Sequence, residues 1–181
     1  MHPGTWLVGR TDNVGFVTAT PVWRPTARIL LADPDERVLL FSARERDGER
    51  WWFTPGGGLH RGETVVAGAA RELLEETGIR ATEAELGPVV ATSFSRWYAA
   101  ESGKLFFSAH SFFFLRVTSS RIDTDGQEEL ERAMITGHRW WSTAELRAAT
   151  ERISPRGLAD LMERLLRDGA PGRPVRLPGR S

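Results

Sequence analysis

Hydrophobic and polar positions in the first part of the chain predict a β-hairpin. Two short apolar runs, residues 27–32 and 38–43, flank Asp33-Pro34-Asp35-Glu36, a combination that favours a turn. Residues 44–50 are polar and predict a loop that leads to Trp51. We therefore expect two strands that pair through a tight turn, followed by an exposed connection.

Residues 64–78 have the spacing of an amphipathic helix. Thr64 is an acceptable N-cap, and Gly78 stands where a helix ends in a left-handed residue. Between them, side chains that recur at helical spacing form one stripe, made of Val66, Ala69, Ala70, Leu73 and Thr77. We predict that this stripe is buried.

Further strands are predicted downstream of this helix. Residues 86–97 have an extended pattern, and residues 104–118 predict a long strand whose odd positions make one apolar face. Arg139-Trp140-Trp141 predicts a last short strand.

Two helices follow these strands. The first is predicted to begin with a capping box made by Ser142 and Glu145. The second covers residues 155–167 and places four apolar side chains on one side: Leu158, Leu161, Met162 and Leu165.

The 181 residues fit one domain of ordinary size, for which we expect the bounds 26–168. Residues 1–25 form an N-terminal segment in which 14–20 predicts a short strand and Pro21 and Pro25 break any helix. Residues 169–181 are rich in Pro, Gly and Arg and predict a mobile C-terminal tail.

Charge and composition exclude several classes of protein. The 24 basic and 24 acidic residues balance, which argues against a stable nucleic-acid partner or an anionic membrane surface. There is no cysteine, and the four histidines stand singly without zinc-ligand spacing. The chain begins without a signal-peptide pattern and has no run of membrane length, so we expect a cytoplasmic protein.

Glutamates converge on one face of the predicted helix. Glu72, Glu75 and Glu76 stand at positions i, i+3 and i+4, near the C-terminal end where the helix macrodipole disfavours anions. Such crowding is readily tolerated if a divalent cation lies among the carboxylates. All-oxygen ligands favour Mg²⁺ or Mn²⁺ over zinc.

The same stretch fits the pattern G-x5-E-x7-R-E-U-x-E-E-x-G-U, in which U is a bulky aliphatic residue. Every specified position is occupied: Gly57, Glu63, Arg71, Glu72, Leu73, Glu75, Glu76, Gly78 and Ile79. This is the Nudix box, and the chain resembles the Nudix hydrolases. The resemblance implies an α/β fold, the Nudix-type α/β/α sandwich with a mixed central sheet.

The resemblance also implies roles for residues around the box. It implies that Glu72, Glu75 and Glu76 hold the cation together with the carbonyl of Gly56. An ion pair between Glu63 and Arg71 is expected to brace the loop against the helix.

Candidate substrate contacts are less specific. Gly57 belongs to a glycine loop that lets the backbone approach a phosphate, and Arg44 and Arg46 offer charge for phosphate. Trp52 is suited to stacking on a base, although packing of its ring in the core explains it as well.

The resemblance implies cleavage of the diphosphate linkage of a nucleoside diphosphate joined to another group, with a modified nucleoside triphosphate as one option. Hydrolysis of ADP-ribose, a nucleotide sugar or a dinucleoside polyphosphate stays open, as does a non-catalytic nucleotide-sensing module. The expected partner is a small-molecule nucleotide, and a homodimer is left open.

Two places in the chain offer a general base. Glu72 in the box is one. The other is the acidic segment 123–131, where Glu129 and Glu131 are the candidates. A solvated acidic turn explains this segment equally well.

Overall fold

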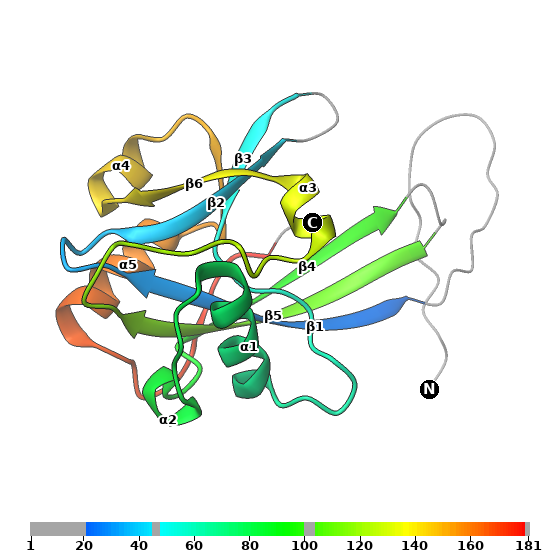
Figure 1. The fold of residues 1–181 in the computed structure, drawn as a ribbon, viewed down its shortest axis with the longest axis horizontal. Coiled ribbons are helices and arrows are strands. Elements are labelled where there is room, and N and C mark those ends of the chain that lie inside the picture. Colours follow the sequence, from blue (N-terminus) through cyan, green and yellow to red (C-terminus); the bar gives the residue numbers. More distant parts are fainter. Residues whose placement is uncertain (1–20, 45–47, 100–103, 180–181) are drawn as a thin grey trace.

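The structure is a computed structural model, and it describes residues 21–44, 48–99 and 104–179. The strand expected over residues 14–20 lies outside these ranges. The helices and strands of these ranges (Figure 1) have the following bounds: β1 Val22–Ala32, β2 Val38–Arg44, β3 Arg50–Phe53, α1 Val65–Thr77, α2 Glu83–Leu86, β4 Ala91–Ala99, β5 Lys104–Arg116, α3 Glu129–Met134, β6 Ile135–Trp141, α4 Thr143–Ala148, β7 Arg152–Ser154, α5 Leu158–Asp168 and β8 Val175–Arg176.

The strands form one mixed sheet in the order β7-β3-β2-β1-β5-β4-β8, with β6 also paired to β2. The predicted hairpin is present, because β1 and β2 are antiparallel and Ala32 pairs with Val38. The longest pairing joins β1 and β5 in parallel from Val22–Phe106 to Ala32–Arg116. The first strand of the hairpin, β1, therefore lies in the middle of the sheet.

Helices cover both faces of the sheet, as the α/β/α prediction requires (Figure 1). Alternate residues of β1 explain why. Ile29 and Leu31 pack with α1, whereas Leu30 and Ala32 belong to the cluster that includes α5. On β5, Phe113 joins the first cluster and Phe112 the second. The single apolar face predicted for residues 104–118 is thus incomplete, because the C-terminal half of this strand is covered on both sides.

Three local differences from the predictions have identifiable causes. Residues 86–97 are not extended throughout, since a capping box between Thr82 and Glu85 starts α2 and β4 begins only at Ala91. The final helix begins at Leu158, because Gly157 before it has φ 79 and a left-handed backbone. The strand ending at Trp141 is not the last, since β7 and β8 follow it.

Residues 169–179, where composition predicts a mobile tail, lie against the sheet. Val175–Arg176 form β8, which pairs in parallel with β4 at Ala91 and Thr92. Leu177 is only 7% exposed and belongs to the same cluster as α5. One buried apolar side chain and a short backbone ladder hold a segment whose average composition is typical of disorder.

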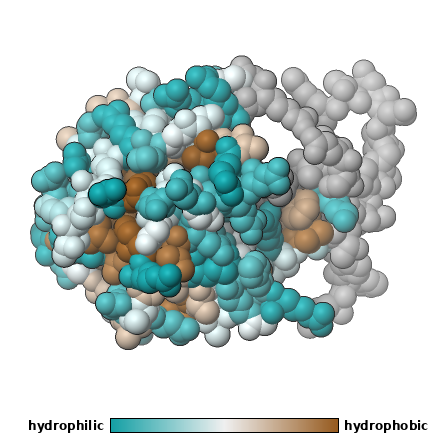
Figure 2. Space-filling view, viewed as in Figure 1, coloured by the Kyte–Doolittle hydropathy of each residue, from teal (hydrophilic) through white to brown (hydrophobic). Residues whose placement is uncertain are grey.

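Figure 2 shows hydrophilic residues over much of one molecular face, with hydrophobic areas exposed among them. None of the helices in the described ranges is long and apolar enough to cross a membrane.

Candidate metal and phosphate site

A glycine loop pairs with the middle of β1. The amide of Ala27 donates to the carbonyl of Gly57 over 3.1 Å, and that of Ile29 donates to Pro55 over 2.9 Å. Gly56 has φ 117, and a Cβ atom there would overlap the carbonyl oxygen of Ala27. Glycine is therefore required at this position both for backbone conformation and for space.

Gly57 is required for a different reason. A Cβ atom on this residue would stand 2.5 Å from Oε1 of Glu72. The absence of a side chain lets the Glu72 carboxylate lie against the loop backbone. Gly57, predicted to contact substrate, thus also shapes the space around a predicted metal ligand.

Helix α1 presents the carboxylates, and both predicted ends are confirmed. The Thr64 side chain accepts from the amide of Ala67 over 3.1 Å, and Gly78 is left-handed with φ 70. The buried side of the helix contains Ala69, Leu73 and Thr77, but Glu72 and Glu76 are buried as well. The carboxylate face is therefore turned inward rather than towards solvent.

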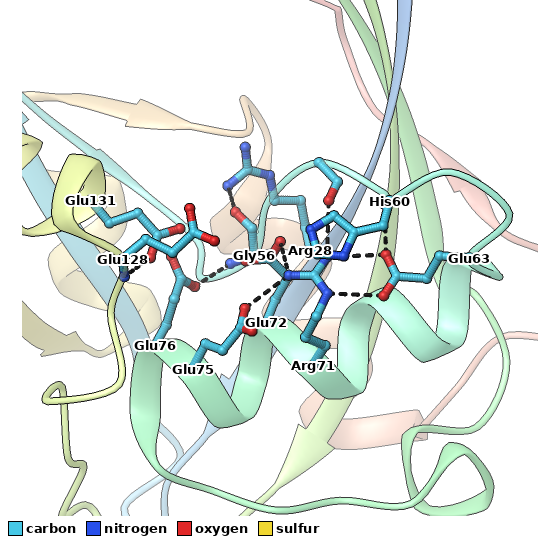
Figure 3. A network of polar contacts seen from close by, with 11 residues as sticks. Arg28, Gly56, His60, Glu63, Arg71, Glu72, Glu75, Glu76, Glu128 and Glu131 are labelled. Atoms are coloured by element: carbon cyan, nitrogen blue, oxygen red, sulfur yellow. Dashed lines mark hydrogen bonds and ion pairs between the residues drawn. The ribbon is translucent and has the colours of Figure 1, made fainter.

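The expected ion pair between Glu63 and Arg71 is present (Figure 3). Arg71 donates from Nε to Oε1 of Glu63 over 2.9 Å and from Nη2 to Oε2 over 3.1 Å. Nη2 also donates to the carbonyl of Gly58 over 3.0 Å. The hydrogen bonds from Arg71 hold the pKa of Glu63 at about 2, with a further contribution from the amide of His60. Loop and helix are thus tied together by charge.

Three carboxylates meet beside the glycine loop: those of Glu72, Glu76 and Glu131. One oxygen from each lies within 4.8 Å of the others. Glu72 and Glu76 are only 4% and 2% exposed, and Glu131 is half-buried. Figure 3 shows that Glu131 comes from α3 and points towards Glu76. Of the two acidic-segment candidates, Glu131 reaches the site, whereas Glu129 is exposed.

Burial makes this group a strong candidate for binding a cation. Burial raises the pKa of Glu76 to about 8, despite the hydrogen bond that its Oε2 accepts from the amide of Gly56 over 2.5 Å. Burial also raises the pKa of Glu72, against the opposing charge of Arg71. Ionised carboxylates this close and this buried need a positive charge among them. Carboxylate oxygens fit Mg²⁺ or Mn²⁺.

Arg28 is part of the site, and our sequence reasoning missed it. Its Nη1 donates to the carbonyl of Thr54 over 3.3 Å and to that of Gly56. Burial lowers the pKa of Arg28, whereas the charges of Glu76 and Glu72 raise it. The available signal was an arginine inside the otherwise apolar run 27–32. The Gly56 carbonyl expected to face the cation thus already accepts one hydrogen bond, and a carbonyl has a second lone pair.

Two predicted ligands or bases lie away from the carboxylate group. Glu75 is directed to Arg71, whose Nη1 donates to its Oε2 over 2.8 Å. The i,i+4 spacing on α1 brings these two side chains together. Glu129 is the first residue of α3 and is directed to solvent. The metal-ligand role of Glu75 and the catalytic role of Glu129 therefore stay predictions.

The predicted substrate contacts differ in their surroundings. Arg44 donates to the carbonyl of Gly48 in its own hairpin, over 3.0 Å, and Arg46 lies outside the described residues. Trp52 is 6% exposed, and its ring meets that of Trp141 edge-on at 5.0 Å. This burial favours core packing, the alternative that the sequence left open for Trp52.

Comparisons with known proteins show the family to which the chain belongs. The model of the NUDIX domain matches residues 22–162, so the chain belongs to the Nudix family. It is 38% identical over 63 residues to an RNA pyrophosphohydrolase of Caulobacter vibrioides, which covers 35% of this chain and 37% of that protein. The chain spans about a third of the length of the curated relatives that it matches.

Solved structures show the same fold. The MutT protein from Methanosarcina mazei matches with a TM-score of 0.56 at 19% identity, over 85% of this chain and 100% of the other. A bifunctional NMN adenylyltransferase/ADP ribose pyrophosphatase from Francisella tularensis, complexed with AMP and a manganese ion, matches with a TM-score of 0.54 at 18% identity. That match covers 82% of this chain and 42% of the other.

Proposed function

We propose that this chain hydrolyses the diphosphate linkage of a nucleoside diphosphate joined to another group, and that it requires Mg²⁺ or Mn²⁺. The observation that carries the proposal is the group of carboxylates at Glu72, Glu76 and Glu131, two of them almost fully buried. Family membership supports it. The names of relatives point to diphosphate substrates of different kinds, an RNA end in one and ADP-ribose in another.

The residues of the site have different roles in this proposal, according to the element on which they lie. Glu72 and Glu76 hold the cation from α1, and Glu131 approaches it from α3. When bound, the cation neutralises the diphosphate and acidifies the attacking water. Arg71 fixes one oxygen of Glu72 over 2.9 Å, which limits the ways in which this carboxylate can turn.

Glu131 is the proposed general base. Its Oε2 accepts from the amide of Glu128 over 3.0 Å, and no hydrogen bond from another described residue reaches its other oxygen, which can take a proton from water. Glu72 is held more tightly, between Arg71 and Gly57. A base on α3 would act from a different element than the two buried carboxylates of α1.

The substrate is tested by a panel of compounds with Mg²⁺ or Mn²⁺. The panel contains modified nucleoside triphosphates, ADP-ribose, nucleotide sugars, dinucleoside polyphosphates and 5′-triphosphorylated RNA, with release of phosphate or diphosphate as the readout. Glu76→Gln is the control, because it removes a buried ligand while keeping the shape of the side chain. Without a divalent cation, we expect the wild-type protein to lose all turnover. If the wild-type protein binds a nucleotide but does not hydrolyse it, the result would instead support the nucleotide-sensing alternative.

A further inference from the structure

Arg28 is a positively charged residue of the site that has no role in the proposed hydrolysis so far. It lies on β1 with its side chain directed to the glycine loop, and its Nη1 is engaged by the carbonyls of Thr54 and Gly56. Figure 3 shows its guanidinium beside the carbonyl of Gly56, whose amide donates to the carboxylate of Glu76. Charges that act on it include those of Glu72, Glu76 and Glu131.

The remaining donors of Arg28, Nε and Nη2, lie along one edge of the guanidinium. A guanidinium binds an oxoanion best through Nε and Nη2 together. Arg71 uses this edge for Glu63, and Arg37 uses it for Asp33. Within the described parts of the chain, no hydrogen bond is found from Nε or Nη2 of Arg28.

This edge is also reachable by a ligand. The described side-chain polar atoms that are enclosed and unpartnered belong to Trp52, Gln127 and Trp141, and none belongs to Arg28. Arg28 itself is half-buried. Its Nη1 is therefore anchored to backbone, whereas its Nε and Nη2 are not among the enclosed polar atoms of the described residues.

We propose that Arg28 binds the diphosphate of the substrate through its Nε–Nη2 edge, as a fixed positive charge beside the divalent cation. This inference rests on the proposed function, and it assigns to Arg28 the phosphate contact that the sequence suggested for Arg44 and Arg46. The anchor on the Gly56 carbonyl holds the guanidinium in place before substrate arrives, which reduces the entropy lost on binding.

A purely structural role for Arg28 has a different signature. If Arg28 only holds the loop, removing it loosens Gly56 and weakens binding of both the cation and the diphosphate. If Arg28 binds phosphate, removing its charge weakens diphosphate binding, whereas cation binding is unchanged or tighter because a nearby repulsive charge is gone. Only under the proposal, therefore, does diphosphate binding weaken while cation binding does not.

The experiment measures two affinities by calorimetry in wild type, Arg28→Gln and Arg28→Lys. One is that of Mn²⁺ alone, and the other is that of imidodiphosphate, a diphosphate that resists hydrolysis, in saturating Mg²⁺. We expect Arg28→Gln to weaken imidodiphosphate binding about 10–100-fold, the size expected for charge-assisted hydrogen bonds, without weakening Mn²⁺ binding. Arg28→Lys keeps the charge but not the fork, so its loss is expected to be smaller.

Arg24→Gln is the matched control, since it removes the same charge from the same face of β1. Arg24 is exposed and lies over Gly58 rather than Gly56. An effect of Arg24→Gln as large as that of Arg28→Gln would overturn the proposal in favour of general charge. Parallel weakening of Mn²⁺ and imidodiphosphate in both Arg28 variants would also overturn it.

Two further outcomes are decisive. If Arg28→Gln does not fold, Arg28→Lys serves as the test variant, because it retains a donor for Gly56. It must still weaken the binding of imidodiphosphate without weakening that of Mn²⁺. Wild-type binding of imidodiphosphate without hydrolysis of any panel compound would refute the proposed function while leaving the role of Arg28 in binding measurable.

Discussion

Replacing Glu63 by Gln tests whether the brace between loop and helix depends on charge. The substitution keeps the size of the side chain but removes the carboxylate that Nε and Nη2 of Arg71 and the amide of His60 hold. The pKa of Glu63 is about 2 instead of 4.5, chiefly because of the hydrogen bonds from Arg71. At about 1.4 kcal/mol per pKa unit, this difference corresponds to at most about 3.5 kcal/mol at pH 7.

The measured loss should be smaller, at about 2 kcal/mol, because glutamine keeps part of the hydrogen bonding and solvent screens the charges. The folded-state pKa lies below the unfolded-state value. The stabilisation is therefore complete above about pH 4.5 and is lost as the pH falls towards about 2. At pH 3 the cost of Glu63→Gln should have fallen to below about 1 kcal/mol.

Urea unfolding followed by tryptophan fluorescence, in EDTA at pH 7 and pH 3, gives both values. Glu75→Gln is the control, because Glu75 accepts a single N–H of Arg71 and its side chain is 33% exposed. Its cost should stay below about 0.5 kcal/mol at either pH. The same cost for Glu63→Gln at pH 7 and at pH 3 would refute the assignment of this stability to the ionised pair.

Three further predictions concern the carboxylate group and the C-terminal segment. Because the folded-state pKa of Glu76 is raised to about 8, metal-free protein should lose stability as the pH rises from about 4.5 towards 8; Glu76→Gln should reduce that dependence and the gain in Tm caused by Mg²⁺. Glu131→Gln should lower kcat about 10²–10⁴-fold and weaken Mg²⁺ binding less than Glu76→Gln does, while Glu129→Gln stays near wild type; loss of kcat in Glu72→Gln alone would place the base in the box. Leu177→Ala should cost about 2–4 kcal/mol in urea unfolding, whereas no loss would agree with a mobile tail.

The parts of the fold that sequence predicted depend on nearby residues. Thr64 and Gly78 set the ends of α1 within a few positions of themselves, and Glu63 reaches Arg71 across a short loop. Periodicity also predicted the buried side of α5. In each of these cases, the physical cause and its effect lie close together in the chain.

The parts that escaped prediction depend on distant residues. Glu131 enters the site only because α3 precedes β6, which pairs with β2. Arg28 was hidden in an apolar run, because its role appears only when the loop at Gly56 lies against β1. Leu177 lies in a segment of disorder-like composition, yet it fills the cluster that also contains α5. Tertiary pairing, rather than local preference, decides these positions.

The carboxylates of Glu76 and Glu131 come from separate elements, and residues 77–130 connect them. A cation shared by the two closes this long stretch into a ring, much as a disulfide would in a protein that has cysteines. Closing a ring of this length lowers the entropy of the unfolded chain as well as filling a site in the folded one. Since the ring contains β4 and β5, the stabilisation that a bound cation provides extends to these two strands.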